Sequence, residues 1–372
     1  MIDFGQVSRE EFLEKYWQKK PLLIKHALPN FISPLSPDEL AGLSCEEEFE
    51  SRVVKGSTQR NDWSLENGPF QDDYFESVPQ NDWTLLIQGV DKHILEVCRL
   101  IEEFDFIPRW RFDDVMISFA AKGGSVGPHY DHYDVFLLQG LGRRQWQISS
   151  LDCSPNNYVK NSELRIMESF QEEDTFIAEP GDILYVPPGI AHHGTSLDSE
   201  CITLSFGYRS YSATEMMEVL ELKSHKRNND YYIDPNWLID IGNSEISNSA
   251  VNQALELLNI DQLPAEFFGC FVTRLDPFDQ QKLNEMMAFE EPIEIEVSAS
   301  YILSPICRIA YQMIETELHV FINGECFDTE LFDQDLLIRF CNTRMIKINH
   351  QSTLLAKKLS SLHLIEKISD HN

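Results

Sequence analysis

The segment between residues 115 and 208 constrains the fold more than any other part of the sequence, because short strand-like runs alternate there with turn residues. The runs occupy residues 115–119, 134–139, 143–148, 183–186 and 201–208. Gly140 and Gly142 separate the second run from the third, which predicts a hairpin at this point. Repeated antiparallel strands of this length predict a jelly roll, the double-stranded β-helix of cupins.

Histidines and a carboxylate lie in this segment at a spacing that suits a metal ion. His129 and Asp131 are two residues apart, so in an extended strand both side chains point to the same face. His192 follows a later strand that opens with the turn sequence Pro-Gly-Asp at 180–182. Two imidazoles and one carboxylate on one side of an ion, with the other side open, form the facial triad of non-haem Fe(II) oxygenases. These three residues therefore predict an Fe(II) site in the mouth of the barrel.

Neighbouring residues offer competing ligands. His132 and Asp134 repeat the His-x-Asp spacing on the opposite face of the strand, and His193 adjoins His192. The run that follows, residues 135–138, is apolar on both faces and does not decide between the two pairs. Each histidine has a further interpretation as a core or turn residue whose hydrogen bonds are satisfied within the protein. Strand alternation alone leaves the choice of ligands open.

A basic side chain is predicted to point into the barrel. Arg144, Trp146 and Ile148 share one face of their strand, and the apolar members of that face must look inward. A buried guanidinium needs an anion, and its planar fork suits a carboxylate. The functional interpretation is an anchor for the distal carboxylate of 2-oxoglutarate, and the alternative is an ion pair with a protein carboxylate. Ser118 and Thr203, two small hydroxyl residues on barrel strands, are candidates for further cosubstrate contacts.

Composition limits the partners of the chain. The formal net charge of −31 repels nucleic acid and attracts basic ligands, although a solubility surface explains the same charge. No apolar run approaches the roughly 20 residues of a membrane helix, and the first residues do not resemble an export signal. The eight cysteines contain no C-x-x-C pair, as expected for reduced thiols. We therefore expect a cytoplasmic protein without a membrane segment.

The remainder of the chain predicts two further parts after a catalytic domain at residues 1–209. Residues 210–295 read as a helical module, interpreted as a dimerisation element of a homodimer, with a first helix at 213–226 and a loop at 227–230. Residues 296–372 combine an Asn-Gly hairpin at 323–324 with flanking helices and resemble a winged helix. Residues 301–372 hold 7 Lys and Arg against 9 Asp and Glu, so direct nucleic-acid binding is not expected.

Several motifs together resemble the bacterial JmjC-type ribosomal oxygenases. In the barrel they are GPHYD at 127–131, YDVF at 133–136, QGLGRRQW at 139–146 and PGDILYVPPGIAH at 180–192. Near the N-terminus they are WQKKP at 17–21 and ISPLSPDELAGL at 32–43. The resemblance covers the barrel and the N-terminal segment and is thin beyond residue 210. It implies a mainly β fold with helices, in which a cupin-like barrel precedes a helical dimerisation module and a winged helix.

The resemblance also implies a set of roles. Fe(II) is held by His129, Asp131 and His192, and 2-oxoglutarate and dioxygen are the cosubstrates. Arg144 pairs with the far carboxylate of 2-oxoglutarate, and Ser118 lies where the family has a second contact. Thr203 lies near a position that carries an amide in the family. The implied reaction is hydroxylation of a side chain of a basic ribosomal protein, an arginine of large-subunit protein sixteen.

Three other functions remain open at this stage. A JmjC-type lysine demethylase has the same metal and cosubstrate residues but needs a cage for a methylammonium group. A small-molecule cupin dioxygenase commonly uses more histidines and leaves Arg144 without a carboxylate to bind. A non-catalytic binding module has no need of an intact ligand set. Asp113 and Asp114 are candidates to receive a basic side chain, or form a solvated turn, and Tyr133 is expected to be a core aromatic.

Overall fold

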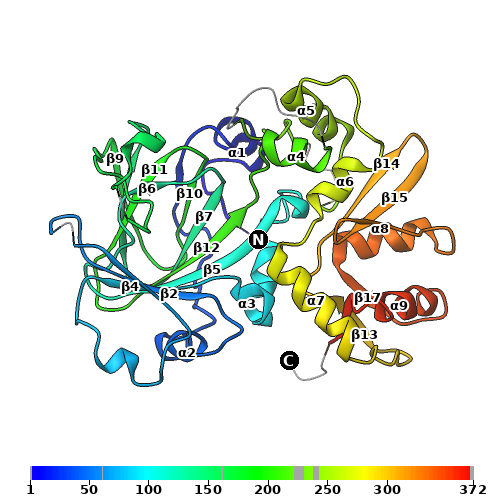
Figure 1. Cartoon of the computed structure of the whole chain (residues 1–372), viewed down its shortest axis with the longest axis horizontal. Coiled ribbons are helices and arrows are strands. Elements are labelled where there is room, and N and C mark those ends of the chain that lie inside the picture. The colour runs from blue at the N-terminus through cyan, green and yellow to red at the C-terminus, as the bar shows by residue number, and fades with distance from the viewer. Residues whose placement is uncertain (1, 61, 161, 222–229, 238–242, 369–372) are drawn as a thin grey trace. The chain divides into compact units, whose positions relative to one another are not determined.

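The computed structural model describes residues 2–60, 62–160, 162–221, 230–237 and 243–368 (Figure 1). The chain divides into two compact units. The first contains Met1–Phe104 and Phe112–Ser210, and the second contains Asp105–Arg111 and Tyr211–Asn372.

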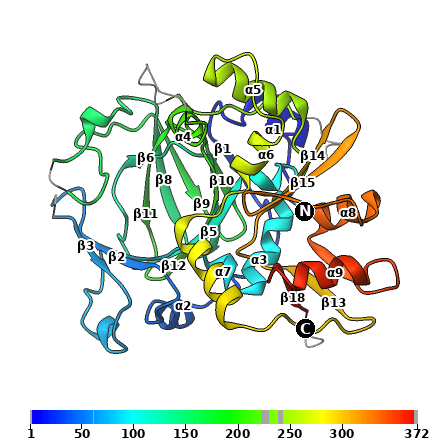
Figure 2. The same cartoon turned by 45° about the vertical axis from the view of Figure 1, so that its right-hand side comes forward.

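Two antiparallel sheets form the first unit (Figures 1 and 2). The larger has the order β1-β10-β7-β12-β5-β4-β2-β3, and the smaller has the order β6-β11-β8-β9. The larger sheet comprises β1 (Leu22–Ile24), β2 (Ser51–Lys55), β3 (Ser64–Asn67), β4 (Trp83–Ile87), β5 (Phe112–Ala120), β7 (Val135–Leu141), β10 (Ile183–Val186) and β12 (Cys201–Tyr208). The smaller comprises β6 (His129–Tyr130), β8 (Arg144–Ser149), β9 (Asp174–Ala178) and β11 (Ala191–Ser196).

The predicted jelly roll is confirmed, but the predicted hairpin at residues 140–142 is wrong. β7 pairs with β10 and β12 in the larger sheet, whereas β8 pairs with β9 and β11 in the smaller one. The turn at Gly142 therefore carries the chain from one sheet to the other. A double-stranded β-helix requires this crossing, and the turn residues alone do not distinguish it from a hairpin.

The interior of the barrel is filled by side chains from both sheets. Its buried apolar cluster consists of Val135, Leu137, Trp146, Ile148, Ala178, Leu184 and Val186. These residues alternate along their strands with residues of the other face, as period-2 alternation predicts. The helices of this unit are α1 (Arg9–Lys15), α2 (Pro37–Leu43) and α3 (Leu95–Leu100).

The second unit combines helices with two small sheets, ordered β14-β15-β16 and β17-β13-β18. Asn323 and Gly324 both have positive φ, as a tight hairpin turn between β15 and β16 requires, so this predicted hairpin is confirmed. The strands are β13 (Ser300–Leu303), β14 (Ile309–Ile314), β15 (Glu317–Ile322), β16 (Glu325–Phe327), β17 (Met345–Lys347) and β18 (Ile365–Lys367). The helices are α4 (Ala213–Val219), α5 (Asn248–Leu258), α6 (Phe267–Val272), α7 (Pro277–Phe289), α8 (Gln334–Thr343) and α9 (Thr353–Ser360).

Two of the elements predicted for this unit extend beyond the described residues. The helix predicted at 213–226 is α4, which ends at Val219, and residues 222–229 lie outside the described residues, as does most of the predicted loop at 227–230. The division at residue 295 and the dimerisation role stay predictions. Within the described residues, no helix is long and apolar enough to cross a bilayer.

Candidate metal centre and substrate cavity

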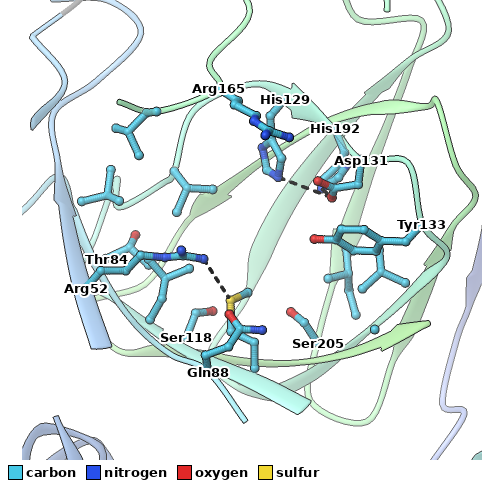
Figure 3. A pocket seen from close by; sticks show the side chains of 18 of the residues that line it. Arg52, Thr84, Gln88, Ser118, His129, Asp131, Tyr133, Arg165, His192 and Ser205 are labelled. Atoms are coloured by element: carbon cyan, nitrogen blue, oxygen red, sulfur yellow. Dashed lines mark hydrogen bonds and ion pairs between the residues drawn. The ribbon is translucent and has the colours of Figure 1, made fainter. Parts of the chain in front are cut away.

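The structure brings His129, Asp131 and His192 together. His129 on β6 lies directly opposite His192 on β11 in the ladder, and their ring centroids are 4.3 Å apart. Asp131 follows β6, and its Oδ2 lies 3.8 Å from His129 Nε2 and 3.7 Å from His192 Nε2 (Figure 3). Alternation along the strand predicts that His129 and Asp131 share a face, and the register of β6 against β11 adds His192 to them.

The hydrogen bonds of the two imidazoles direct the same ring nitrogen toward Asp131. His129 Nδ1 lies 3.0 Å from the carbonyl oxygen of Gly127, and His192 Nδ1 lies 3.3 Å from that of Ile190. Donation from Nδ1 to a backbone carbonyl leaves Nε2 as the lone-pair nitrogen, which is how metal-binding histidines are oriented. Burial and the neighbouring His129 lower the pKa of His192 to about 4, so this imidazole is neutral near pH 7.

This donor set fits a divalent metal ion. Two atoms that each lie about 2.1 Å from one ion are at most about 4.2 Å apart, and both distances to Asp131 Oδ2 fall within that limit. The ligand atoms of all three residues lie within 4.8 Å of one another. Two nitrogens and one oxygen on one side, facing a cavity on the other, are the pattern of the two-histidine, one-carboxylate iron site.

The competing ligands have other partners. Asp134 is fully buried and accepts hydrogen bonds from Tyr185 Oη and from Gln18 Nε2, so it joins β10 to the N-terminal segment. The ring of His132 packs edge-on against Tyr130, 5.6 Å between centroids. His193 pairs with Gln147 in the ladder and packs edge-on against Phe170. These three residues therefore lie outside the cluster of His129, Asp131 and His192.

The prediction that Arg144 points into the barrel is confirmed. Arg144 is 5% exposed, whereas the side chain of Arg143 is 50% exposed and pairs with Asp198. Arg144 Nη1 donates to Ser118 Oγ over 3.4 Å, and the guanidinium lies 5.4 Å from the centre of the Trp146 ring.

The buried guanidinium of Arg144 lacks a protein anion. Its Nε is buried without a hydrogen-bond partner, and no ion pair joins it to a carboxylate in the described part of the chain. An unpaired buried charge is costly, so this position suits an anionic ligand. Arg144 and the three possible metal ligands line the same cavity, which has a volume of about 420 Å³.

Ser118 and Thr203 occupy different environments. Ser118 lines the cavity and contacts Arg144, as described above. Thr203 lies opposite Ser118 in the β5–β12 ladder, but its hydroxyl donates to Gln139 Oε1 over 3.1 Å, and Thr203 is not among the residues that line the cavity. A direct contact between Thr203 and a cosubstrate stays a prediction.

An acidic group lies elsewhere in the same cavity. Asp114 Oδ2 accepts hydrogen bonds from Gln88 Nε2 over 2.6 Å and from the Gly89 amide over 2.9 Å, which leaves Oδ1 for a ligand. Burial and the adjacent Asp113 raise the pKa of Asp114. Behind it, Asp91 is buried and accepts from the Val115 amide, and burial together with Asp114 raises the pKa of Asp91. Asp113 itself pairs with Arg209 over 2.9 Å.

Sequence reasoning missed part of this cavity. Tyr133 is 42% exposed and points into the cavity, so its assignment as a core aromatic is wrong (Figure 3). Alternation does place Tyr133 on the face of His129, and that signal could have found it. Arg52 and Gln88 come from the strand and loop that extend the larger sheet, and no motif in the sequence marks them.

Comparison with known proteins agrees with this geometry. Residues 99–216, which include the three possible metal ligands, match the JmjC domain family. The ribosomal protein uL16 3-hydroxylase of Escherichia coli is 35% identical over 270 residues, which is 71% of this chain and 71% of that protein. The chain belongs to the JmjC-type ribosomal oxygenases. The expectations of family, fold class and enzyme class are thereby confirmed.

Other ribosomal oxygenases match over different shares of their length. The Haemophilus influenzae protein named "Probable ribosomal oxygenase" is 38% identical over 221 residues, which is 58% of this chain and 54% of that protein. Among solved structures, YcfD, a ribosomal oxygenase from Escherichia coli in complex with cobalt and 2-oxoglutarate, superposes with a TM-score of 0.69 at 27% identity. That match covers 98% of this JmjC oxygenase and 99% of YcfD, so the similarity extends through the second unit.

Proposed function

We propose that this chain is an Fe(II)- and 2-oxoglutarate-dependent oxygenase that hydroxylates an arginine side chain of ribosomal protein uL16. One observation carries the proposal: a two-histidine, one-carboxylate cluster and a buried arginine without a protein anion line one cavity. The first is suited to iron, and the second to the far carboxylate of a dicarboxylate cosubstrate.

His129, Asp131 and His192 would hold Fe(II), which when bound couples the decarboxylation of 2-oxoglutarate to succinate with oxygen insertion into a C–H bond. Arg144 would bind the far carboxylate of 2-oxoglutarate with its planar fork, and Ser118 Oγ would add a hydrogen bond to the same group. The guanidinium of Arg144 lies over the Trp146 ring, and this contact would limit the orientations of the guanidinium and of the cosubstrate bound to it.

Asp114 would bind the substrate. Its Oδ2 is held by Gln88 and Gly89, so the carboxylate presents Oδ1 in a fixed direction. In the free protein, burial of the Asp114 carboxylate raises its pKa. A substrate guanidinium that pairs with Oδ1 would offset the cost of burying this charge. Tyr133 offers its ring as a wall for the apolar stem of the same side chain. The net charge of −31 would attract a basic ribosomal protein.

A set of matched peptides tests the substrate assignment. A fragment of uL16 and versions in which each arginine is replaced by lysine are incubated with the protein, Fe(II), ascorbate and 2-oxoglutarate, and succinate is measured. We expect one arginine to be required and its lysine replacement to be inactive, because a lysine lacks the fork. Turnover with methylated lysine peptides instead would indicate a demethylase, and turnover with a small molecule alone a cupin dioxygenase.

Assembly and compartment belong to the same proposal. Residues 210–295 would form the dimerisation module of a homodimer, and residues 296–372 a winged helix without a role in nucleic-acid binding. A ribosomal-protein substrate would place the protein in the cytoplasm with ribosomes. Sedimentation of the full chain and of a chain ending at residue 209 tests the assignment, because only the full chain should dimerise.

A further inference from the structure

A second cluster of metal-binding side chains lies in the second unit. Its members are Glu266, just before α6, His319 on β15 and Cys326 on β16. One ligand atom from each lies within 4.8 Å of the others, and His319 Nδ1 is 3.2 Å from Glu266 Oε1. Glu266 and Cys326 are exposed and His319 is partly buried, so solvent reaches the cluster.

The hairpin of β15 and β16 places two of the donors on one face. Phe321 lies directly opposite Cys326 in the ladder, and residues opposite each other share a face of the sheet. His319 is two residues before Phe321 on the same strand and therefore projects to that face as well. His319, Phe321 and Cys326 thus form one row on the hairpin.

The helix α6 packs closely onto this face, as Figure 1 shows for α6 and β15. A Cβ on Gly269 would lie 2.3 Å from Cε2 of Phe321, so glycine permits the close approach of α6 to the Phe321 ring. Glu266 lies three residues before Gly269 and Cys270 one residue after it. The close approach thereby brings the carboxylate of Glu266 and the thiol of Cys270 against the hairpin.

Cys270 supplies a fourth donor. Burial raises the pKa of the Cys270 thiol and the neighbouring Cys326 lowers it, while burial and Glu266 raise the pKa of Cys326. Glu266 and Cys270 are four residues apart, the spacing that places two side chains on one side of a helical turn. One sulfur, one imidazole nitrogen and one carboxylate oxygen therefore converge from a helix and a hairpin, with the Cys270 thiol as a neighbour of Cys326.

We propose that Glu266, Cys270, His319 and Cys326 bind a divalent zinc ion. Thiolate and imidazole are the ligands that zinc prefers, and four protein donors give the closed tetrahedral shell of a structural site. The ion would link α6 to the β15–β16 hairpin and neutralise the three acidic groups that the donors present. The ligand type separates this site from the barrel site, where two nitrogens and one oxygen suit iron.

Cobalt is the probe for this site, because Co²⁺ bound by thiolates in a tetrahedron gives a near-ultraviolet charge-transfer band and strong visible bands. The full chain carrying His129→Ala and Asp131→Ala, which removes the barrel ligands, is titrated with Co²⁺ under reducing conditions. We expect the thiolate bands to saturate at one equivalent and to disappear when Zn²⁺ is added. Cys326→Ser and His319→Ala should abolish the bands, whereas Cys45→Ser, at a thiol outside the cluster, should leave them unchanged.

Alkylation of the unmodified chain provides a measurement that does not depend on the folding of a variant. Zn²⁺ should slow the reaction of Cys270 and Cys326 with iodoacetamide at least tenfold, as seen by peptide mass spectrometry, and should not affect Cys45. Absence of thiolate bands together with equal alkylation rates would overturn the proposal and leave Glu266 and His319 as a surface ion pair. Bands that survive Cys270→Ser unchanged would overturn the assignment of the fourth ligand.

Discussion

Replacing Asp114 by Asn should stabilise the fold and impair the reaction. Asp114 lies beside Asp113, and burial together with this neighbour raises the pKa of Asp114 from 3.8 to about 6. A carboxyl with a raised pKa in the folded protein destabilises the fold once it ionises, and the substrate guanidinium would relieve this cost. Asn removes the charge and keeps an oxygen for the bonds from Gln88 and Gly89.

The magnitude follows from the pKa of Asp114. The difference between 3.8 and about 6, at about 1.4 kcal/mol for each pKa unit, corresponds to about 3 kcal/mol. Asp114 is only partly buried, and its hydrogen bonds weaken when the acceptor loses its charge. We therefore expect Asp114→Asn to raise the free energy of unfolding by about 1–2 kcal/mol above pH 7.

The gain in the free energy of unfolding from Asp114→Asn should depend on pH. Below 3.8 the carboxyl is protonated in both the folded and the unfolded protein, so the gain from Asn should vanish there. It should grow as the pH rises from 3.8 to about 6 and stay constant above that value. Urea unfolding followed by circular dichroism measures this difference. Asp198→Asn is the control, because Asp198 does not line the cavity and pairs with Arg143 over 2.9 Å.

Asp114→Asn should also act less efficiently on the uL16 fragment. Truncating one partner of a buried charge pair costs about 2–5 kcal/mol, so kcat/KM for the uL16 fragment should fall by at least about thirtyfold, with 2-oxoglutarate binding unchanged. An Asp114→Asn protein that is less stable than the parent above pH 7 would contradict the destabilising charge of Asp114, and one that is equally active on the fragment would contradict its role in substrate binding.

Three further outcomes are expected. Asp131→Ala should abolish 2-oxoglutarate turnover and leave the circular dichroism spectrum unchanged; persisting turnover would reassign the metal site. Arg144→Ala should weaken 2-oxoglutarate binding, measured by calorimetry, by about 2–5 kcal/mol because it removes the cavity's buried cation, whereas Arg143→Ala, at an exposed site, should not. KM for the arginine substrate should rise as the pH falls through about 6, because protonated Asp114 no longer attracts a guanidinium, and a flat profile would exclude that role.

Local periodicity predicted the barrel site well. Alternation along a strand placed Arg144 with Trp146 inside and Arg143 outside, because the inward face of a barrel strand must be apolar or paired. The same rule placed Asp131 with His129. The register of β11 against β6, a pairing between segments about 60 residues apart, brings His192 and not His193 opposite His129.

What the sequence did not reveal depends on contacts between distant segments. The turn at Gly142 has the composition of a hairpin, and only the pairing of β7 and β8 with different sheets shows that it joins them. Burial and Asp114 together raise the pKa of Asp91, which lies in the turn after β4 and is 23 residues away from Asp114 in the sequence. Glu266 and His319 are 53 residues apart, so no local motif marks their cluster.

Mass spectrometry of purified uL16 tests most directly whether the site formed by His129, Asp131 and His192 supports hydroxylation of an arginine of uL16. The protein is incubated with uL16, Fe(II), ascorbate and 2-oxoglutarate, with the Asp131→Ala variant as control. We predict that one arginine of uL16 gains the mass of one oxygen atom with the parent protein only, with succinate formed in equal amount. Succinate without modified uL16 would contradict the substrate, and neither product would contradict the oxygenase itself.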